Sequence, residues 1–199
     1  MQPAALGFRV HSGWTSLIAV ALAGNRPVIL VRQRPHLVAT FSYAFRQPYH
    51  TARKMTLAEA KIFLTKQRKE ARRLALAAIR SAQSFSAQQG FLVSRAALLV
   101  ASGRALPRLP QILASHSLIH SADGEFFREA LLYACDRASL PAIKFRDRDL
   151  VATASSDLGR TPAKLTQIIA AVGKPLGSPW TADEKLATLA AWRSLAARG

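Results

Sequence analysis

The sequence has a single cysteine and no long apolar run. Cys135 has no second thiol to pair with, so an intrachain disulfide is excluded. This cysteine content is typical of the reducing cytoplasm, where we expect the protein to reside. A membrane-spanning helix needs about 20 consecutive apolar residues, and no stretch approaches that length, so we expect no membrane association. The sequence also lacks the Walker A, GxGxxG and GxSxG patterns, which removes three common signatures of nucleotide binding and hydrolysis.

Acidic residues are scarce, and none occurs near the start of the chain. The 199 residues include 28 Lys and Arg but 11 Asp and Glu, a net charge of +17, and the first carboxylate is Glu59. Residues 1–115 hold 17 of the basic residues and two of the acidic ones. Such an imbalance attracts polyanions, nucleic acid before an anionic membrane. The alternative is a bias of composition, since the chain is rich in Ala, Arg and Leu.

Apolar periodicity and turn residues predict an α/β protein. We expect a β-sheet flanked by helices in residues 1–150, and a small C-terminal extension of helices, residues 151–199, packed on that core. The expected strands are Phe8–Leu22, Pro27–Arg34 with His36–Phe41 as its continuation or as a separate strand, Phe91–Ala101 and Pro141–Phe145. The expected helices are Thr56 to about Gln88, Leu109–His120, a helix from Ser121 or Asp123 to about Ala138, Leu150–Leu158, Pro162–Val172 and Thr181–Ala197.

The long helix after Thr56 has the clearest pattern. Thr56 and Glu59 form a capping box, and Gly90 provides a stop. Apolar residues share one arc of the helix, and all of its cations lie on the opposite arc. A solvated helix face usually mixes charge signs, so a face this one-sided favours contact with phosphate. The cations are Lys61, Lys66, Arg68, Lys69, Arg72, Arg73 and Arg80.

A second row of basic residues is expected on a strand. Val28 and Leu30 are followed at a period of two by Arg32, Arg34 and His36, which places all five on one face of a continuous strand. Together with the long helix, this row predicts a basic face that binds nucleic acid, RNA or DNA. The predicted contacts are Arg32, Arg34, Lys61, Arg68, Lys69, Arg72 and Arg73.

The order of the elements over residues 8–145, together with the closing helix, resembles the ribonuclease H-like superfamily, which includes Holliday-junction resolvases and actin-like ATPases. The resemblance implies a mixed sheet with a long helix packed across it. It also implies carboxylates clustered at the centre of the sheet, because phosphodiester hydrolysis in this superfamily uses two divalent metal ions. The segments HSGW, SHSLIHSADGEFFREAL and PLGSPW resemble bacterial sequences to which we attach no function.

The chain departs from that superfamily where its metal ligands should lie. The first strand offers His11, Ser12 and Trp14 but no Asp, and the strand Phe91–Ala101 has Arg95 but no Glu. The closing helix keeps Asp183 and Glu184, followed by Lys185. Hard cations need several oxygen ligands. We therefore expect neither a metal cofactor nor two-metal nuclease activity.

His116 and His120 form the densest chemical group together with Asp123 and Glu125. Two histidines at i and i+4 can bind zinc on a continuous helix, but the Ser121–Gly124 segment predicts a break. In the alternative, the histidines line a helix end and the two carboxylates cap the next helix. We expect no metal here.

Two other functions stay open. One is an enzyme whose site gathers catalytic residues at the end of the sheet for acid–base or single-metal chemistry; it requires His11 to come within one side-chain length of His116 or His120. Its candidate residues are His11, His116, His120, Asp123 and Glu125, with Asp183 and Trp180. The other is a protein-interaction module whose basic face meets an acidic partner. Oligomeric state is not predicted.

Overall fold

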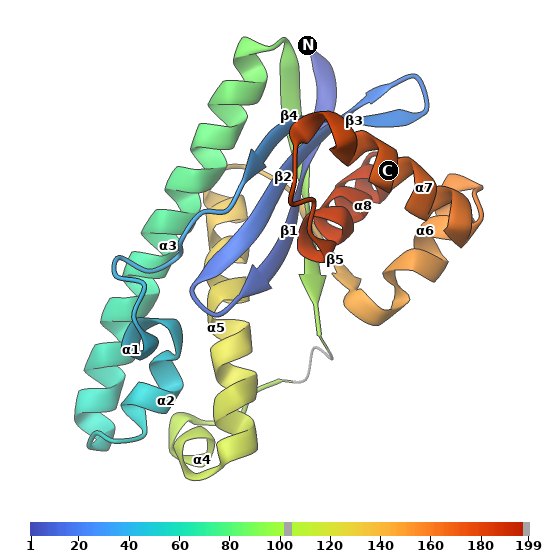
Figure 1. Cartoon of the computed structure of the whole chain (residues 1–199). Helices are drawn as coiled ribbons and strands as arrows, with labels where there is room; N and C mark the ends of the chain where they lie inside the picture. Colours follow the sequence, from blue (N-terminus) through green and yellow to red (C-terminus); the bar gives the residue numbers. More distant parts are fainter. Residues whose placement is uncertain (102–104, 197–199) are drawn as a thin grey trace.

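The computed structural model describes residues 1–101 and 105–196, and within them the strands form one mixed five-stranded sheet (Figure 1). The strand order is β3-β2-β1-β4-β5. β2 pairs antiparallel with β1 and with β3, and β4 pairs parallel with β1 and with β5. The strands are β1 (Gln2–His11), β2 (Trp14–Ala23), β3 (Arg26–Gln33), β4 (Phe91–Val100) and β5 (Ala142–Arg146). The predicted α/β class and single mixed sheet are confirmed.

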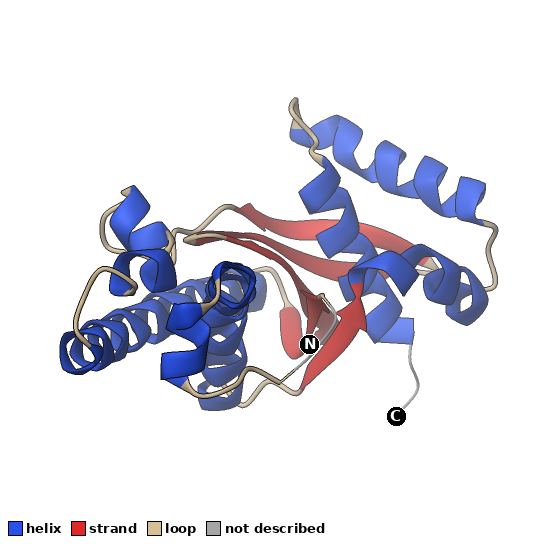
Figure 2. Cartoon of the chain, turned by 90° about the horizontal axis from the view of Figure 1, so that it is seen from below, coloured by secondary structure: helices blue, strands red, loops and turns tan. Residues whose placement is uncertain are grey.

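Helices cover both faces of the sheet (Figure 2). The sheet therefore separates two apolar cores, one under each layer of helices. α3 and α5 pack on one face, and α8 packs on the other, across β1, β2 and β4, with α6 and α7 beside it. None of the described helices is both long and apolar enough to cross a membrane. The helices are α1 (Tyr43–Arg46), α2 (Pro48–Ala52), α3 (Leu57–Gln88), α4 (Leu109–Ala114), α5 (His116–Arg137), α6 (Leu150–Leu158), α7 (Pro162–Gly173) and α8 (Ala182–Ala196), with the 3-10 turns Asp147–Asp149 and Lys174–Leu176.

Local signals fix the ends of α3, as the sequence predicts. The Thr56 hydroxyl accepts from the backbone N–H of Glu59, and the Glu59 carboxylate accepts from the backbone N–H of Thr56. The helix ends just before Gly90, whose φ is +86°. α8 belongs to the predicted C-terminal extension, residues 151–199, and yet it packs directly on the sheet. The division of the chain into domains stays a prediction.

The contact between β1 and α8 depends on a glycine. A Cβ atom at Gly7 would lie 1.9 Å from the carbonyl oxygen of Ala187 and 3.1 Å from the Ala191 side chain. The backbone of α8 can therefore approach β1 only where the strand has no side chain. On the opposite face of β1, Leu6 and Phe8 are fully buried against α3 and α5.

The predicted break at Ser121–Gly124 is wrong, because α5 runs without interruption from His116 to Arg137. The chain breaks earlier, at Ser115 between α4 and α5. Ser121 donates its hydroxyl to the carbonyl of Ser117 inside the helix, while Ala122 and Asp123 are buried. Tertiary burial thus overrides the weak helix preference of Ser, Asp and Gly. Asp123 lies within the helix and does not cap it.

Two predicted strands are also wrong. The expected strand Phe8–Leu22 is divided by a turn at Ser12-Gly13 into the antiparallel pair β1 and β2. The segment His36–Phe41 forms no strand. β3 ends at Gln33, and of this segment only His36 forms a bridge, opposite Trp14. The register between β2 and β3 shifts at Ala19/Val20, where a bulge leaves Leu30 without a partner. A bulge turns every later side chain to the other face. Arg32 therefore does not share a face with Leu30, and the predicted single row of basic residues is not formed.

Cys135 is buried among apolar residues of the core beneath α3 and α5. Burial raises the pKa of its thiol to about 12. A thiol with that pKa is almost entirely protonated at neutral pH and is a poor nucleophile. Cys135 is therefore a core residue.

Two glycine substitutions test the close contact between α8 and β1 at Gly7. We expect Gly7→Ala to lower the free energy of unfolding by about 2–3 kcal/mol, because the added methyl group displaces α8 from the sheet. We expect Gly124→Ala to leave stability unchanged or raise it by up to about 1 kcal/mol, because the new Cβ would meet only the flexible end of Arg128, at 3.3 Å. Urea unfolding measures both. Equal stability of Gly7→Ala and wild type would contradict the close α8 contact.

Candidate nucleic-acid interface

The parallel strands β1, β4 and β5 all end at the same edge of the sheet, the lower end in Figure 1. A hollow of about 630 Å³ opens there, which we call the strand-end hollow. Ligands of α/β proteins commonly bind beyond the carboxyl ends of the strands. Four of the side chains that line the hollow are cationic and one is anionic. They are Arg9, Arg128, Arg146 and Arg148, and Asp147.

Arg9 at the end of β1 lies between two carboxylates. Its Nη1 is 2.5 Å from Oδ2 of Asp147, and its Nε is 2.7 Å from Oδ1 of Asp183, in the first turn of α8. The other oxygen of Asp183 is 3.0 Å from Nε2 of His11, whose ring stacks on Trp14. Asp183 is thus shared by a guanidinium and an imidazole, and its side chain is only 24% exposed.

A second hollow, of about 510 Å³, lies between α3 and α5; we call it the α3–α5 groove. Tyr133 is exposed on one wall, with the guanidinium of Arg72 over its ring at 4.3 Å. Cations beside an exposed aromatic ring are typical of surfaces that bind single-stranded nucleic acid. The groove is lined by Thr65, Arg68, Lys69, Arg72, Arg73, Leu76 and Tyr133.

Carboxylates neutralise part of this groove. Glu129 of α5 pairs with both Arg68 and Arg72, and Glu70 pairs with Arg73 within α3. Lys61 and Lys69 are exposed, and among the residues that the structure describes neither has a carboxylate within ion-pair distance. Of the five predicted contacts on the long helix, Lys61 and Lys69 therefore lack a counter-charge as expected, whereas Arg68, Arg72 and Arg73 do not.

Arg32 and Arg34 lie away from this groove. Arg32 donates from Nε to Glu184 at 2.6 Å and from Nη1 to the carbonyl of Leu176 at 2.9 Å. These bonds connect β3 to α8 and to the segment before α8. The Arg32 side chain therefore lies on the face of the sheet opposite α3. Arg34 is exposed, and its guanidinium lies 3.6 Å from the ring centre of Trp14. Arg32, one of the seven predicted nucleic-acid contacts, therefore has a structural role, because its guanidinium is bonded to other groups of the chain.

Three histidines meet between α2 and α5, and only two of them were singled out in the sequence. Nε2 of His120 lies 3.0 Å from Nε2 of His116, one helical turn away. His50 of α2 joins them, with its ring centre 4.5 Å from that of His120. The sequence places His50 in a polar connection, and no periodic signal could predict that this connection folds back onto α5.

Asp123 orients this histidine group, whereas Glu125 and His11 lie outside it. Oδ2 of Asp123 is 2.5 Å from Nδ1 of His50, and Oδ1 accepts from the backbone N–H of Tyr49. Burial raises the pKa of Asp123, and the hydrogen bonds from His50 and Tyr49 oppose that rise. Glu125 takes no part in the histidine group, and its carboxylate accepts a hydrogen bond from Nη1 of Arg128. Within the described residues, no hydrogen bond or ring contact joins His11 to His116 or His120.

The comparisons identify the fold. No family model matches the sequence, and no curated protein matches it. Among solved structures, Thermus thermophilus RuvC in complex with a Holliday junction substrate is 11% identical, with a TM-score of 0.57 over 97% of this chain and 93% of that chain. A second structure of Thermus thermophilus RuvC is 10% identical, with a TM-score of 0.53 over the same shares. The chain has the ribonuclease H-like fold.

The residues at the sheet centre do not fit the pair of divalent metal ions that the ribonuclease H-like resemblance implies. β1 places the guanidinium of Arg9 against Asp183, and β4 carries Arg95, which donates to the carbonyl of Ser194 at 2.8 Å. Of the other two carboxylates nearby, Asp147 also pairs with Arg9, and Glu184 pairs with Arg32. A dication among these groups would face fixed positive charge and too few free oxygen ligands.

Glu184→Gln tests the ion pair with Arg32. Burial acts to raise the pKa of Glu184, but hydrogen bonds from Arg32 and Thr181 outweigh it and hold that pKa below its usual 4.5. The carboxylate therefore contributes stability that is fully present above pH 4.5 and is lost as the pH falls through the lowered value. Glu184 and Thr181 also form a capping box at the start of α8, in which Oε2 of Glu184 accepts from the backbone N–H of Thr181 and the Thr181 hydroxyl accepts from the backbone N–H of Glu184. Gln preserves this box, because its amide oxygen can still accept from Thr181.

We expect Glu184→Gln to lower the free energy of unfolding at neutral pH by about 1–3 kcal/mol, since Arg32 loses a charged partner. The difference from wild type should shrink as the pH falls below 4.5 and through the lowered pKa of Glu184, because the wild-type carboxylate becomes protonated there. Urea unfolding of both proteins across this pH range measures it. An equal deficit at every pH would mean that the loss comes from packing rather than from charge.

Proposed function

We propose that this protein binds nucleic acid and does not cleave it by two-metal hydrolysis. The observation that carries the proposal is the strand-end hollow, where four arginines lie at the edge of a ribonuclease H-like sheet. The structural neighbour with a TM-score of 0.57 was solved with a Holliday junction substrate, which supports a nucleic-acid ligand for this fold.

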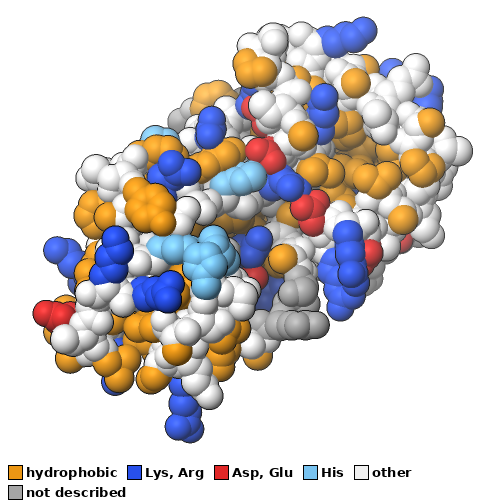
Figure 3. All heavy atoms as spheres, turned by 60° about the horizontal axis from the view of Figure 1, so that its bottom comes forward, with side chains coloured by type: hydrophobic (Ala, Val, Ile, Leu, Met, Phe, Trp, Pro, Cys, Tyr) orange, Lys and Arg blue, Asp and Glu red, His pale blue; other side chains and the backbone are white. Residues whose placement is uncertain are grey.

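The balance of charge supports a polyanionic ligand. Of the 11 acidic residues, all except Glu59 and Asp136 take part in an ion pair with a basic side chain. The excess of cations therefore has to find counterions outside the chain. Figure 3 shows Lys and Arg side chains around the histidines on the lower end of the molecule, with few acidic side chains between them.

The strand-end hollow provides the better candidate contacts. The Arg146 side chain is exposed, and that of Arg148 is 78% exposed beside Asp149. Exposed guanidinium groups can bind phosphate in a bidentate manner. The α3–α5 groove offers further contacts in Lys69 and the ring of Tyr133, and Lys61 is exposed one turn before the groove on α3. A single buried thiol fits the reducing cytoplasm, where such a ligand is available.

Paired substitutions test the interface. In anisotropy titrations of a DNA duplex, a four-way DNA junction and a single-stranded RNA, we expect Arg146→Gln/Arg148→Gln to weaken binding about tenfold or more and to reduce the slope of log affinity against log salt by about 2. Lys61→Gln/Lys69→Gln should act in the same way if the groove is part of the same surface. Each loss reflects two phosphate contacts that no longer release counterions.

Arg26→Gln/Lys164→Gln is the matched control, because it removes two charges near a hollow between β3 and α7, far from the strand ends. We expect its affinity to stay within about twofold of wild type. If the control variant loses as much affinity as the test variants, binding depends on net charge alone and not on the strand-end hollow. Absence of binding to all three probes at about 50 mM salt would remove the proposal and favour an acidic protein partner.

The second expectation is binding without cleavage. With Mg²⁺ or Mn²⁺ added at millimolar concentration, the same probes should remain intact, because Arg9 and Arg32 already pair with the carboxylates of Asp183 and Glu184 that a metal ion would need. Denaturing gels of labelled probes measure this. Metal-dependent cleavage that disappears in Asp183→Asn would show that the ion pair with Arg9 opens to admit a metal ion.

A further inference from the structure

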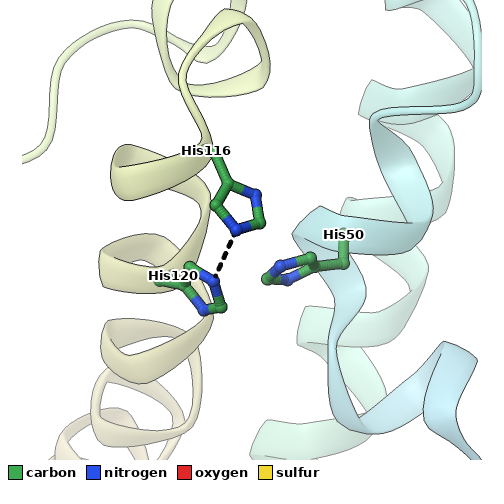
Figure 4. Close-up of side chains that lie close together, drawn as sticks. All are labelled: His50, His116 and His120. Carbon is green, nitrogen blue, oxygen red and sulfur yellow. Dashed lines mark hydrogen bonds between the residues drawn. The ribbon is translucent and has the colours of Figure 1, made fainter.

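The histidine group between α2 and α5 has the composition of a metal site that the proposed nucleic-acid surface does not use. His50, His116 and His120 each offer one ring nitrogen, and these three atoms lie within 4.8 Å of one another. Figure 4 shows the three rings turned toward one another, His116 and His120 from α5 and His50 from the facing α2 helix. The ring centres are 4.5 to 5.6 Å apart.

Asp123 occupies one ring nitrogen of His50 and leaves the other available to a metal ion. Asp123 holds Nδ1 at 2.5 Å, so that Nε2 is the atom available to a ligand. Asp123 is itself 4% exposed and is fixed by the backbone N–H of Tyr49 at 2.7 Å. A buried carboxylate that binds the far nitrogen of an imidazole is the usual means of orienting a histidine toward a metal ion and of raising its basicity.

The spacing on α5 supplies the other two ligands. His116 and His120 are four residues apart on a continuous helix and share one face. Both are exposed, so their rings can rotate without disturbing the core. Their Nε2 atoms are 3.0 Å apart, whereas two nitrogens of a tetrahedral zinc site with bonds near 2.0–2.1 Å are separated by about 3.4 Å. Small rotations therefore suffice to reach coordination geometry.

We propose that His50, His116 and His120 bind one Zn²⁺ ion, with Asp123 as a positioning residue. Three neutral imidazoles favour zinc and its transition-metal neighbours over Mg²⁺ or Ca²⁺, which prefer oxygen ligands. The fourth coordination position faces solvent and takes a water molecule. The ion joins α2 to the start of α5, two segments more than 60 residues apart in the sequence.

The test uses the full chain without a polyhistidine tag, freed of metal with a chelator. At about pH 7.5, where imidazoles are mostly neutral, calorimetric titration with ZnCl₂ should give one site of micromolar or tighter affinity. Titration with Co²⁺ should give the visible absorption bands of a four-coordinate ion. His116→Ala and His120→Ala, both at exposed positions that leave folding intact, should each weaken Zn²⁺ binding at least a hundredfold. Asp123→Asn should weaken it 10- to 100-fold.

His36→Ala is the matched control, because His36 is exposed and stacks on Phe41 away from the group. Its Zn²⁺ affinity should equal that of wild type. The proposal is overturned if wild type binds no stoichiometric Zn²⁺, if His116→Ala and His120→Ala bind as well as wild type, or if His36→Ala weakens binding as much as they do. These outcomes are independent of nucleic-acid binding, which is measured by anisotropy with and without the ion.

Discussion

The approach of α8 to β1 at Gly7 is the constraint on which the rest of the structure depends. The space left by the missing side chain lets the carbonyl of Ala187 sit against the strand, and this contact sets how far α8 lies from the sheet. The first turn of α8 then ends up beside the carboxyl end of β1. Asp183 reaches Arg9 and His11 there, and Glu184 reaches Arg32 on β3. One steric requirement in the core thus determines the partners of two carboxylates on the surface.

Those pairings oppose the two-metal chemistry that the ribonuclease H-like resemblance implies. Both carboxylates of the first turn of α8 already form ion pairs with cations of the same chain, with Nε of Arg9 at 2.7 Å from Asp183 and Nε of Arg32 at 2.6 Å from Glu184. Because partly buried charges interact more strongly than exposed ones, a metal ion would have to displace these cations. The same pairings neutralise carboxylates at the lower end of the molecule, beside Arg146 and Arg148, whose exposed side chains line the strand-end hollow.

Elements defined by local signals could be predicted from the sequence, and elements defined by distant contacts could not. α3 has a capping box at Thr56, a stop at Gly90 and a clear apolar arc, so its bounds were predicted almost to the residue. The bulge in β3 has no sequence signal, and it reverses the face on which Arg32 lies. The continuity of α5 depends on the burial of Ala122 and Asp123 against other elements, which outweighs the local preference of Ser121 and Gly124 for a turn.

The continuity of α5 also decides the chemistry, because this one helix contributes to each candidate site. Near its start, His116, His120 and Asp123 face α2; further on, Arg128 lines the strand-end hollow and Tyr133 lines the α3–α5 groove. Had the helix ended at His120, Asp123 could not be held both in the core and on the ring of His50. A buried carboxylate is costly unless its oxygens are satisfied, and Asp123 satisfies both through α2. The hydrogen bonds that allow Asp123 to be buried are therefore the same ones that fix His50 toward its two partners.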